Sequence, residues 1–194
     1  MRLLAAAFAS VAFVAPPAPG PLGLENVPVP QVPVLAQPQA LKLGQAIDGI
    51  KCERSETVAF HIHAHLAIFV KGKQRQVPYG IGIGPPWSGV RNTTGAFVTQ
   101  GSCFAWMHTH AGDGIIHMEA PKEMTFTLGE FFDVWGLELS STRVGPAHGK
   151  VTALVDGKVA SGNPRAIVLK AHELVQLDVG APVVGQQKVG FAKL

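Results

Sequence analysis

The chain has 194 residues, of which 47% are hydrophobic and 15% are charged, and its formal net charge is +3. A chain of this length can bury a sizeable core within one domain. The lysines and arginines are not clustered, so the composition argues against a nucleic-acid-binding protein and we expect no nucleic-acid partner. Motifs for phosphate-binding loops, nucleophile elbows and HExxH metalloproteases are absent from the sequence.

Residues 1–20, MRLLAAAFASVAFVAPPAPG, have the features of a secretory signal peptide. A single Arg2 precedes an apolar run of about 13 residues with small residues beyond it. A membrane-spanning helix would need about 20 apolar residues. The alternative is that this segment stays uncleaved and anchors the protein in a membrane. We expect no membrane contact other than this N-terminal anchor. We therefore expect a secreted or periplasmic protein.

Residues 21–40 are rich in proline and valine. Such a stretch favours extended, polyproline-like backbone and is typical of a semi-rigid linker. We expect it to hold the folded domain away from the N-terminus. The domain itself, a histidine-rich β domain, is predicted to span residues 41–194.

Two cysteines, Cys52 and Cys103, are the only ones in the chain. In an exported protein an even pair usually forms a disulfide. The alternative is a thiolate ligand, because Cys103 lies five residues before His108. That odd spacing puts the two side chains on opposite faces of a strand, so the disulfide is favoured.

The segment FHIHAHLAIFV, residues 60–70, is rich in β-branched and aromatic residues and predicts a strand. Because side chains alternate along a strand, His61, His63 and His65 share one face. The other face, which begins with Ile62 and Ala64, is wholly apolar and must pack on a core. Imidazole is a common transition-metal ligand, so the first face is a candidate metal site.

A second histidine group lies in CFAWMHTH and GIIHMEAP, which read as two strands joined around Gly112-Asp113. If the turn is tight, His108 lies opposite His117 and His110 lies opposite Ile115. Directly opposed residues have Cβ atoms roughly 5 Å apart, close enough for two imidazoles to bind one ion. Glu119 then shares the face of His117.

The three histidines of the first strand are too widely spaced for one ion, because His61 and His65 are about 13 Å apart at ~3.3 Å per residue. We expect two of them, His63 with His61 or His65, to join His108 and His117. The others would orient these ligands or bind a second ion. The alternative is a cluster without metal that becomes charged near the ordinary histidine pKa of ~6.5. His148 and His172 lack such neighbours and are expected at the surface.

The rest of the chain predicts a mainly β fold, a sandwich or barrel with one short helix. Lys71-Gly72-Lys73 and Asp156-Gly157-Lys158 sit between apolar runs as hairpin turns do. The stretch GIGIGPPWSG, residues 80–89, is expected to be a loop. Thr127 and Glu130 form a capping box that opens a short helix, which Gly136 can end. AIVLK and LVQLDVG supply late strands.

Three segments together, HIHAHLAIFV, CFAWMHTHAGDGIIHMEAP and FTLGEFFDVWG, resemble an uncharacterised family of exported bacterial and archaeal histidine-rich proteins. The resemblance extends from about Cys52 to the end of the chain. It implies a recurrent exported domain and brings no established activity. A weaker resemblance links the H-x-H pattern to the zinc ligands of carbonic anhydrases, although the surrounding residues differ.

These observations predict an exported protein that binds a transition metal through His61, His63, His65, His108, His110 and His117. Imidazole donors suit copper and zinc, and copper is favoured when it is available. The alternative is a metal-dependent enzyme, with a hydrolytic or hydratase zinc site or an oxidative copper or iron site, in which Glu119 is the base. Glu119 could equally accept a histidine N–H and orient that ring.

Overall fold

The computed structural model describes residues 12–192 and 194. It confirms a mainly β fold, and its sheets are not closed, so the arrangement is sandwich-like rather than a barrel. The largest sheet has seven strands. Six of them follow one another in the order β10 (Met107–His108), β11 (Ile115–Ala120), β4 (Phe60–Val70), β19 (Leu174–Val179), β16 (Val151–Val155) and β17 (Lys158–Val159). The seventh, β5 (Lys73–Arg75), also pairs with β4.

Smaller sheets surround this main sheet. One has four strands, β2 (Ala46–Ile47), β3 (Ile50–Glu53), β9 (Cys103–Ala105) and β6 (Ile83–Gly84). The others are β7 (Ser88–Asn92) with β8 (Gly95–Gln100), β12 (Phe126–Thr127) with β18 (Val168–Leu169), β1 (Phe13–Val14) with β20 (Val183–Val184), and the set β13 (Leu139–Ser140), β14 (Arg143–Val144) and β15 (Ala147–His148). Among the described residues, the helical elements are α1 (Leu128–Trp135) and the short 3-10 turn η1 (Pro164–Ala166).

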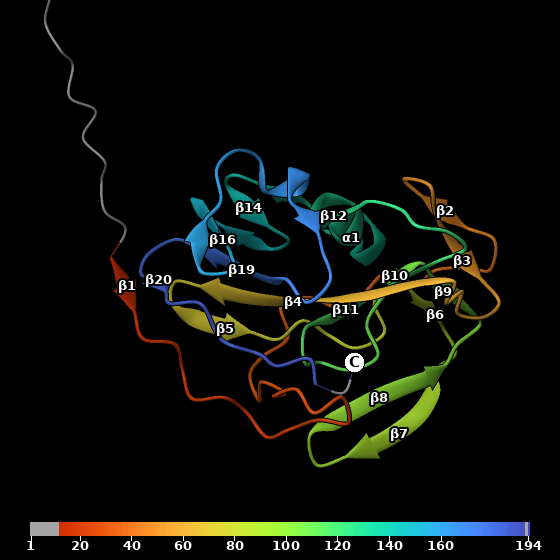
Figure 1. Ribbon diagram of the computed structural model, residues 1–194. Helices are drawn as coiled ribbons and strands as arrows, with labels where there is room; N and C mark the ends of the chain where they lie inside the picture. The colour runs from red at the N-terminus through yellow and green to blue at the C-terminus, as the bar shows by residue number, and fades with distance from the viewer. Residues whose placement is uncertain (1–11, 193) are drawn as a thin grey trace, which may run out of the picture.

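Strand β4 divides the interior into an apolar side and a histidine side. Ala64, Leu66 and Ile68 belong to the main hydrophobic core, in which the aromatic side chains of α1 are also buried. His63 and His65 point to the opposite face and are also buried. In Figure 1, α1 lies on one side of β4 and β11, while the N-terminal segment and the β7–β8 hairpin lie on the other. The predicted separation of the two faces is confirmed.

Helix α1 begins as the sequence predicts. The Thr127 side chain accepts from the backbone N–H of Glu130, and the Glu130 carboxylate accepts from the backbone N–H of Thr127. Gly136 ends the helix in the left-handed region, with φ of 84°. Phe131 and Trp135 are fully buried, so the capping box positions the aromatic face of α1 on the core.

The two predicted hairpin turns are confirmed. Val70 pairs with Lys73 across the first turn, and Val155 pairs with Lys158 across the second. The late segments AIVLK and LVQLDVG contain β18 and β19, as expected. The stretch 80–89 is less irregular than the predicted loop, because it contains β6 and the start of β7.

A disulfide joins Cys52 on β3 to Cys103 on β9. The pairing predicted from the sequence is confirmed, and neither sulfur is free to act as a thiolate ligand. The bond connects the strand that precedes the first histidine group to the strand that opens the second. The disulfide therefore closes the chain segment that contains His61 and His63, and its second cysteine lies five residues before His108.

The proline-rich segment differs from the expected linker because it packs on the domain. Val27 is fully buried, Val29 is nearly so, and Glu25 is buried among polar groups. The backbone N–H of Leu35 also donates to the carbonyl of Gln76. The apolar residues between the prolines explain the difference: they bury surface that a solvated tether would expose.

The predicted signal peptide falls mostly on residues 1–11, which lie outside the described residues. Within the described part of the chain, no helix is both long enough and apolar enough to cross a membrane.

Candidate metal centre

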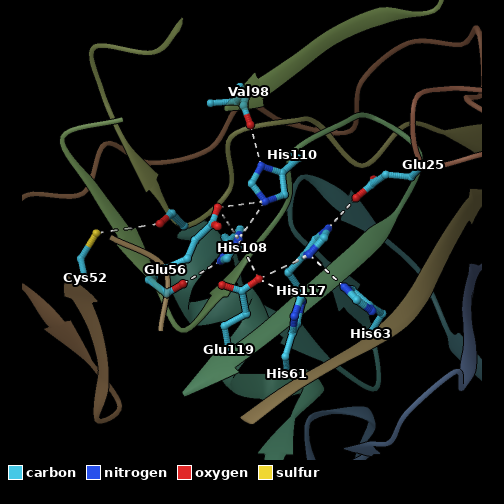
Figure 2. A network of polar contacts seen from close by, with 12 residues as sticks. Glu25, Cys52, Glu56, His61, His63, Val98, His108, His110, His117 and Glu119 are labelled. Atoms are coloured by element: carbon cyan, nitrogen blue, oxygen red, sulfur yellow. Dashed lines mark hydrogen bonds and ion pairs between the residues drawn. The ribbon is translucent and has the colours of Figure 1, made fainter. Parts of the chain in front are cut away.

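Three histidines form a row across three neighbouring strands. His117 on β11 pairs with His108 on β10 and, on its other side, with His63 on β4. The same register places Glu119 opposite His61. The predicted pairing of His108 with His117 is thus confirmed. Figure 2 shows these side chains pointing toward a common centre.

His110 reaches this centre by a different route from the predicted one. The β10 ladder ends at His108, and the carbonyl of His110 accepts from the backbone N–H of Val98 on β8. The β7–β8 hairpin, which the sequence did not predict, therefore holds His110. The ring turns inward, and its Nε2 lies 3.1 Å from Nε2 of His108.

Backbone carbonyls determine which ring nitrogens of these two histidines carry protons. Nδ1 of His108 lies 2.9 Å from the carbonyl oxygen of Ala105, and Nδ1 of His110 is hydrogen-bonded to the carbonyl oxygen of Val98. A carbonyl can only accept, so both Nδ1 atoms donate. In the neutral rings both Nε2 atoms then carry lone pairs, and these face each other. Two acceptors at this distance need a cation between them.

Glu25 sets the orientation of His117. Its Oε1 lies 2.7 Å from Nε2 of His117, so this N–H donates to the carboxylate. Nδ1 of His117 therefore points inward, where it lies 3.1 Å from Nε2 of His63. A carboxylate that holds the outer nitrogen of a histidine is a recurring feature of metal sites, because it fixes the ring and raises its basicity.

Two more carboxylates complete the centre. Oε1 of Glu119 lies 3.0 Å from Nε2 of His61, 3.7 Å from Nδ1 of His117 and 4.0 Å from Nε2 of His108. Oε1 of Glu56, which comes from the loop before β4, lies 3.3 Å from Nε2 of His110. These distances place Glu119 among the donor atoms. Its role as a general base stays a prediction.

Burial keeps most of these rings neutral. Desolvation lowers the pKa of His63 to about 3, helped by the nearby His117 and His61. It also lowers the pKa of His108 and of His110, in both cases reinforced by neighbouring histidines. Burial would lower the pKa of His117 as well, but hydrogen bonds with Glu119 and Glu25 outweigh it and raise that pKa to about 9. Burial thus favours the neutral form of His63, His108 and His110, whereas the two carboxylates favour the charged form of His117.

His65 lies apart from this centre. Its Nε2 is 3.0 Å from the carbonyl oxygen of Asp113, and the ring borders a cavity of about 340 Å³ under the proline-rich segment. His63 and His61, rather than His65, are the members of the first group that join the second. His148 and His172 are exposed, as the sequence predicts.

The donor atoms are spaced as ligands of a metal ion are. Three trios each offer one ligand atom per residue within 4.8 Å of one another: His61, His63 and His117; His108, His110 and His117; and Glu56, His108 and Glu119. Two nitrogens bound at ~2.0–2.1 Å to one tetrahedral ion lie about 3.3 Å apart. The separations of 3.1 Å within the two histidine pairs are close to that value.

Sequence reasoning missed Glu25, Glu56 and Val98, the residues that orient or extend the histidine set. Glu25 is 92 positions away from its partner, in a segment whose composition indicates a linker. Glu56 follows β3 in a short irregular stretch with no periodicity. One feature of the sequence could have indicated Glu25: it is an acidic residue within a proline-rich segment that is otherwise largely apolar.

Comparisons of the chain with protein-family models, with curated proteins and with solved structures find no match.

Proposed function

We propose that this chain is an exported metal-binding protein that holds copper or zinc in the histidine centre. The observation that carries the proposal is the contact between Nε2 of His108 and Nε2 of His110. Both rings donate their Nδ1–H to backbone carbonyls, so their lone pairs converge at 3.1 Å in a buried site. A divalent ion that accepts both lone pairs removes this conflict, and imidazole donors suit copper and zinc.

The alternative, a histidine cluster that responds to pH without a metal, is less well supported. Such a cluster would need buried rings that become charged together near pH 6.5. Burial instead lowers the pKa of His63 and His108 far below that value. The pKa of His117 is raised to about 9 by its carboxylate partners, so this ring stays charged across the same range.

Export is supported by the apolar N-terminal run in the sequence and by the disulfide between Cys52 and Cys103. Disulfides persist mainly in oxidising compartments such as the periplasm or the extracellular space. The resemblance of the histidine segments to exported proteins agrees with this part of the proposal.

Affinity measurements on single variants test the metal centre. We expect His108→Ala, His110→Ala and His117→Ala each to weaken binding of zinc and copper by more than tenfold, because each removes an inward-facing donor. The matched controls His148→Ala and His172→Ala replace exposed histidines and should bind as the unchanged protein does. Competition with a chelator, on protein without a histidine tag, gives the dissociation constants. Unchanged affinity in the first three variants would remove those residues from the site.

A further inference from the structure

Glu119 lies between two sets of donor atoms. On one side are His61, His63 and His117, whose ligand atoms are within 4.8 Å of one another. On the other side are His108, His110 and Glu56. There, Nε2 of His110 lies 3.1 Å from Nε2 of His108 and 3.3 Å from Oε1 of Glu56. Figure 2 shows Glu119 between the two sets.

The contacts of Glu119 reach both sets. Its Oε1 lies 3.0 Å from Nε2 of His61 in the first set and 4.0 Å from Nε2 of His108 in the second. Its Oε2 is buried and has no hydrogen-bond partner among the described residues. A buried carboxylate oxygen without a partner is costly, which indicates that a cation completes its environment.

The number of donors exceeds what one ion uses. Five histidines and two carboxylates offer a ligand atom within these groups, whereas a tetrahedral ion takes four. His117 belongs to both histidine trios. Grouped with His61 and His63, it leaves two sets of four donors that share Glu119: three histidines with Glu119, and two histidines with Glu56 and Glu119. Each set matches the donor number of one zinc or copper ion.

We propose that the centre binds two metal ions bridged by the carboxylate of Glu119. His61, His63 and His117 hold the first ion, and His108, His110 and Glu56 hold the second. Two ions in such a site lie about 3.5–4 Å apart. The inference rests on the proposed metal-binding function and adds the number of ions and the ligands of each.

His61 and Glu56, the two outer donors, lie at the protein surface, where an ion can enter from solvent. The side chains of His61 and Glu56 are 36% and 37% exposed, whereas the side chain of Glu119 between them is only 3% exposed. Each ion therefore has one donor at the protein surface and shares one donor in the interior. Removing an outer donor should weaken one ion while the other keeps its ligands.

Metal stoichiometry tests the two-ion centre. Untagged full chain is stripped with a chelator, titrated with zinc by calorimetry and analysed for bound zinc after dialysis. We expect two equivalents per chain, falling to one in Glu56→Ala and to one in His61→Ala. The control Glu123→Ala, which removes an exposed carboxylate, should keep two. One equivalent in the unchanged chain would overturn the two-ion proposal and leave metal binding standing. No bound zinc or copper would overturn the proposed function itself.

Copper electron paramagnetic resonance tests the bridge. Two copper(II) ions joined by one carboxylate couple magnetically. The unchanged chain with two equivalents of copper should therefore give an integrated signal far weaker than that of two isolated copper(II) ions. Glu56→Ala with its single ion should show the full signal of one isolated ion. Two uncoupled ions in the unchanged chain would overturn the bridging role of Glu119. Circular dichroism of each variant establishes that the fold is kept.

Discussion

Glu25 acts on the centre through a single hydrogen bond. Because its carboxylate accepts from Nε2 of His117, Nδ1 of that ring is the atom left to bind metal. Without this acceptor the ring can exchange its protonated nitrogen and rotate. The proline-rich segment, through the side chain of Glu25, thus orients the ring of His117, a proposed ligand on β11.

We predict that Glu25→Ala lowers metal affinity by about 10–100-fold, the usual effect of removing a residue that orients a metal-ligating histidine. Glu25→Gln should have a smaller effect, because the amide oxygen can still accept the N–H. Gln31→Ala, which replaces an exposed residue of the same segment that contacts none of the histidines, is the control. Chelator competition measures all three. Wild-type affinity in a folded Glu25→Ala protein would show that the segment does not control His117.

His65 illustrates the cost of a buried histidine outside the centre. Burial lowers its pKa to about 4, and the hydrogen bond to the Asp113 carbonyl offsets only part of this shift. The ring in the unfolded chain has its ordinary pKa of about 6.5. Between these two values the unfolded chain binds a proton that the folded protein does not. The free energy of unfolding therefore falls as the pH is lowered from 6.5 toward 4, and His65 contributes nothing to this dependence above 6.5.

We predict that His65→Gln loses this part of the acid sensitivity, which amounts to about 3 kcal/mol over the full window. Glutamine can still donate to the carbonyl but does not titrate. Urea unfolding of metal-free protein at pH 7 and pH 4.5 measures how far the free energy of unfolding falls with pH. His148→Gln, which replaces an exposed histidine, is the control. An equal loss of unfolding free energy between pH 7 and pH 4.5 in His65→Gln and in the unchanged protein would show that His65 does not cause this acid sensitivity.

At the scale of elements, the short strand β10 must lie close to the glycine-rich stretch before β6. Gly82 has φ of +71°, and a Cβ at this position would lie 2.1 Å from the carbonyl oxygen of Met107 and 3.0 Å from Cβ of His108. Only glycine allows this approach without moving β10. The stretch that is predicted from the sequence to be a loop thus positions His108, one of the proposed metal ligands.

We predict that Gly82→Ala lowers both the melting temperature and the metal affinity, because β10 and His108 must shift. Gly157→Ala is a matched control: Gly157 has φ of +79°, and a Cβ there meets nothing within 4 Å. It carries the same backbone strain, roughly 1–2 kcal/mol, without displacing a ligand. Thermal unfolding and chelator competition separate the two effects. Equal affinity in both variants would show that β10 tolerates the displacement.

Local patterns predicted the elements that carry most of the centre. Alternation along residues 60–70 was sufficient for the two faces of β4, and the spacing around Gly112-Asp113 was sufficient for the pairing of His108 with His117. The capping box predicted α1 because Thr127 and Glu130 satisfy each other within one turn. In each of these cases the deciding contacts lie close together in the sequence.

The remaining features depend on contacts between distant segments. The three alternating histidines of β4 span more than the width of one metal site. Only the pairing of β4 with β11 determines which of them lie beside the second histidine group. Glu25 enters the centre because Val27 and Val29 find a partner surface, which composition alone cannot reveal. His110 joins through the backbone hydrogen bond that its carbonyl accepts from Val98 of β8, a contact between two segments that the sequence pattern did not connect.

In the molecule as a whole, the candidate metal centre lies between the main sheet and the segments that cover its histidine face. The histidine face is covered by the proline-rich segment and by the β7–β8 hairpin, and the apolar face packs with α1 (Figure 1). The disulfide joins β3 and β9 beside this region. Segments from residue 25 to residue 119 therefore converge on one buried polar site. A metal ion that binds the folded chain and not the unfolded chain should stabilise this arrangement.

X-ray absorption at the zinc edge, on untagged protein loaded with zinc, tests most directly whether these histidines bind a metal ion. We expect a shell of nitrogen and oxygen at about 2.0–2.1 Å with the outer-shell scattering of several imidazole rings. His108→Ala should lose part of this imidazole scattering, and His148→Ala should retain it. A spectrum with oxygen neighbours alone, or no zinc retained after dialysis, would contradict a metal centre built from these histidines.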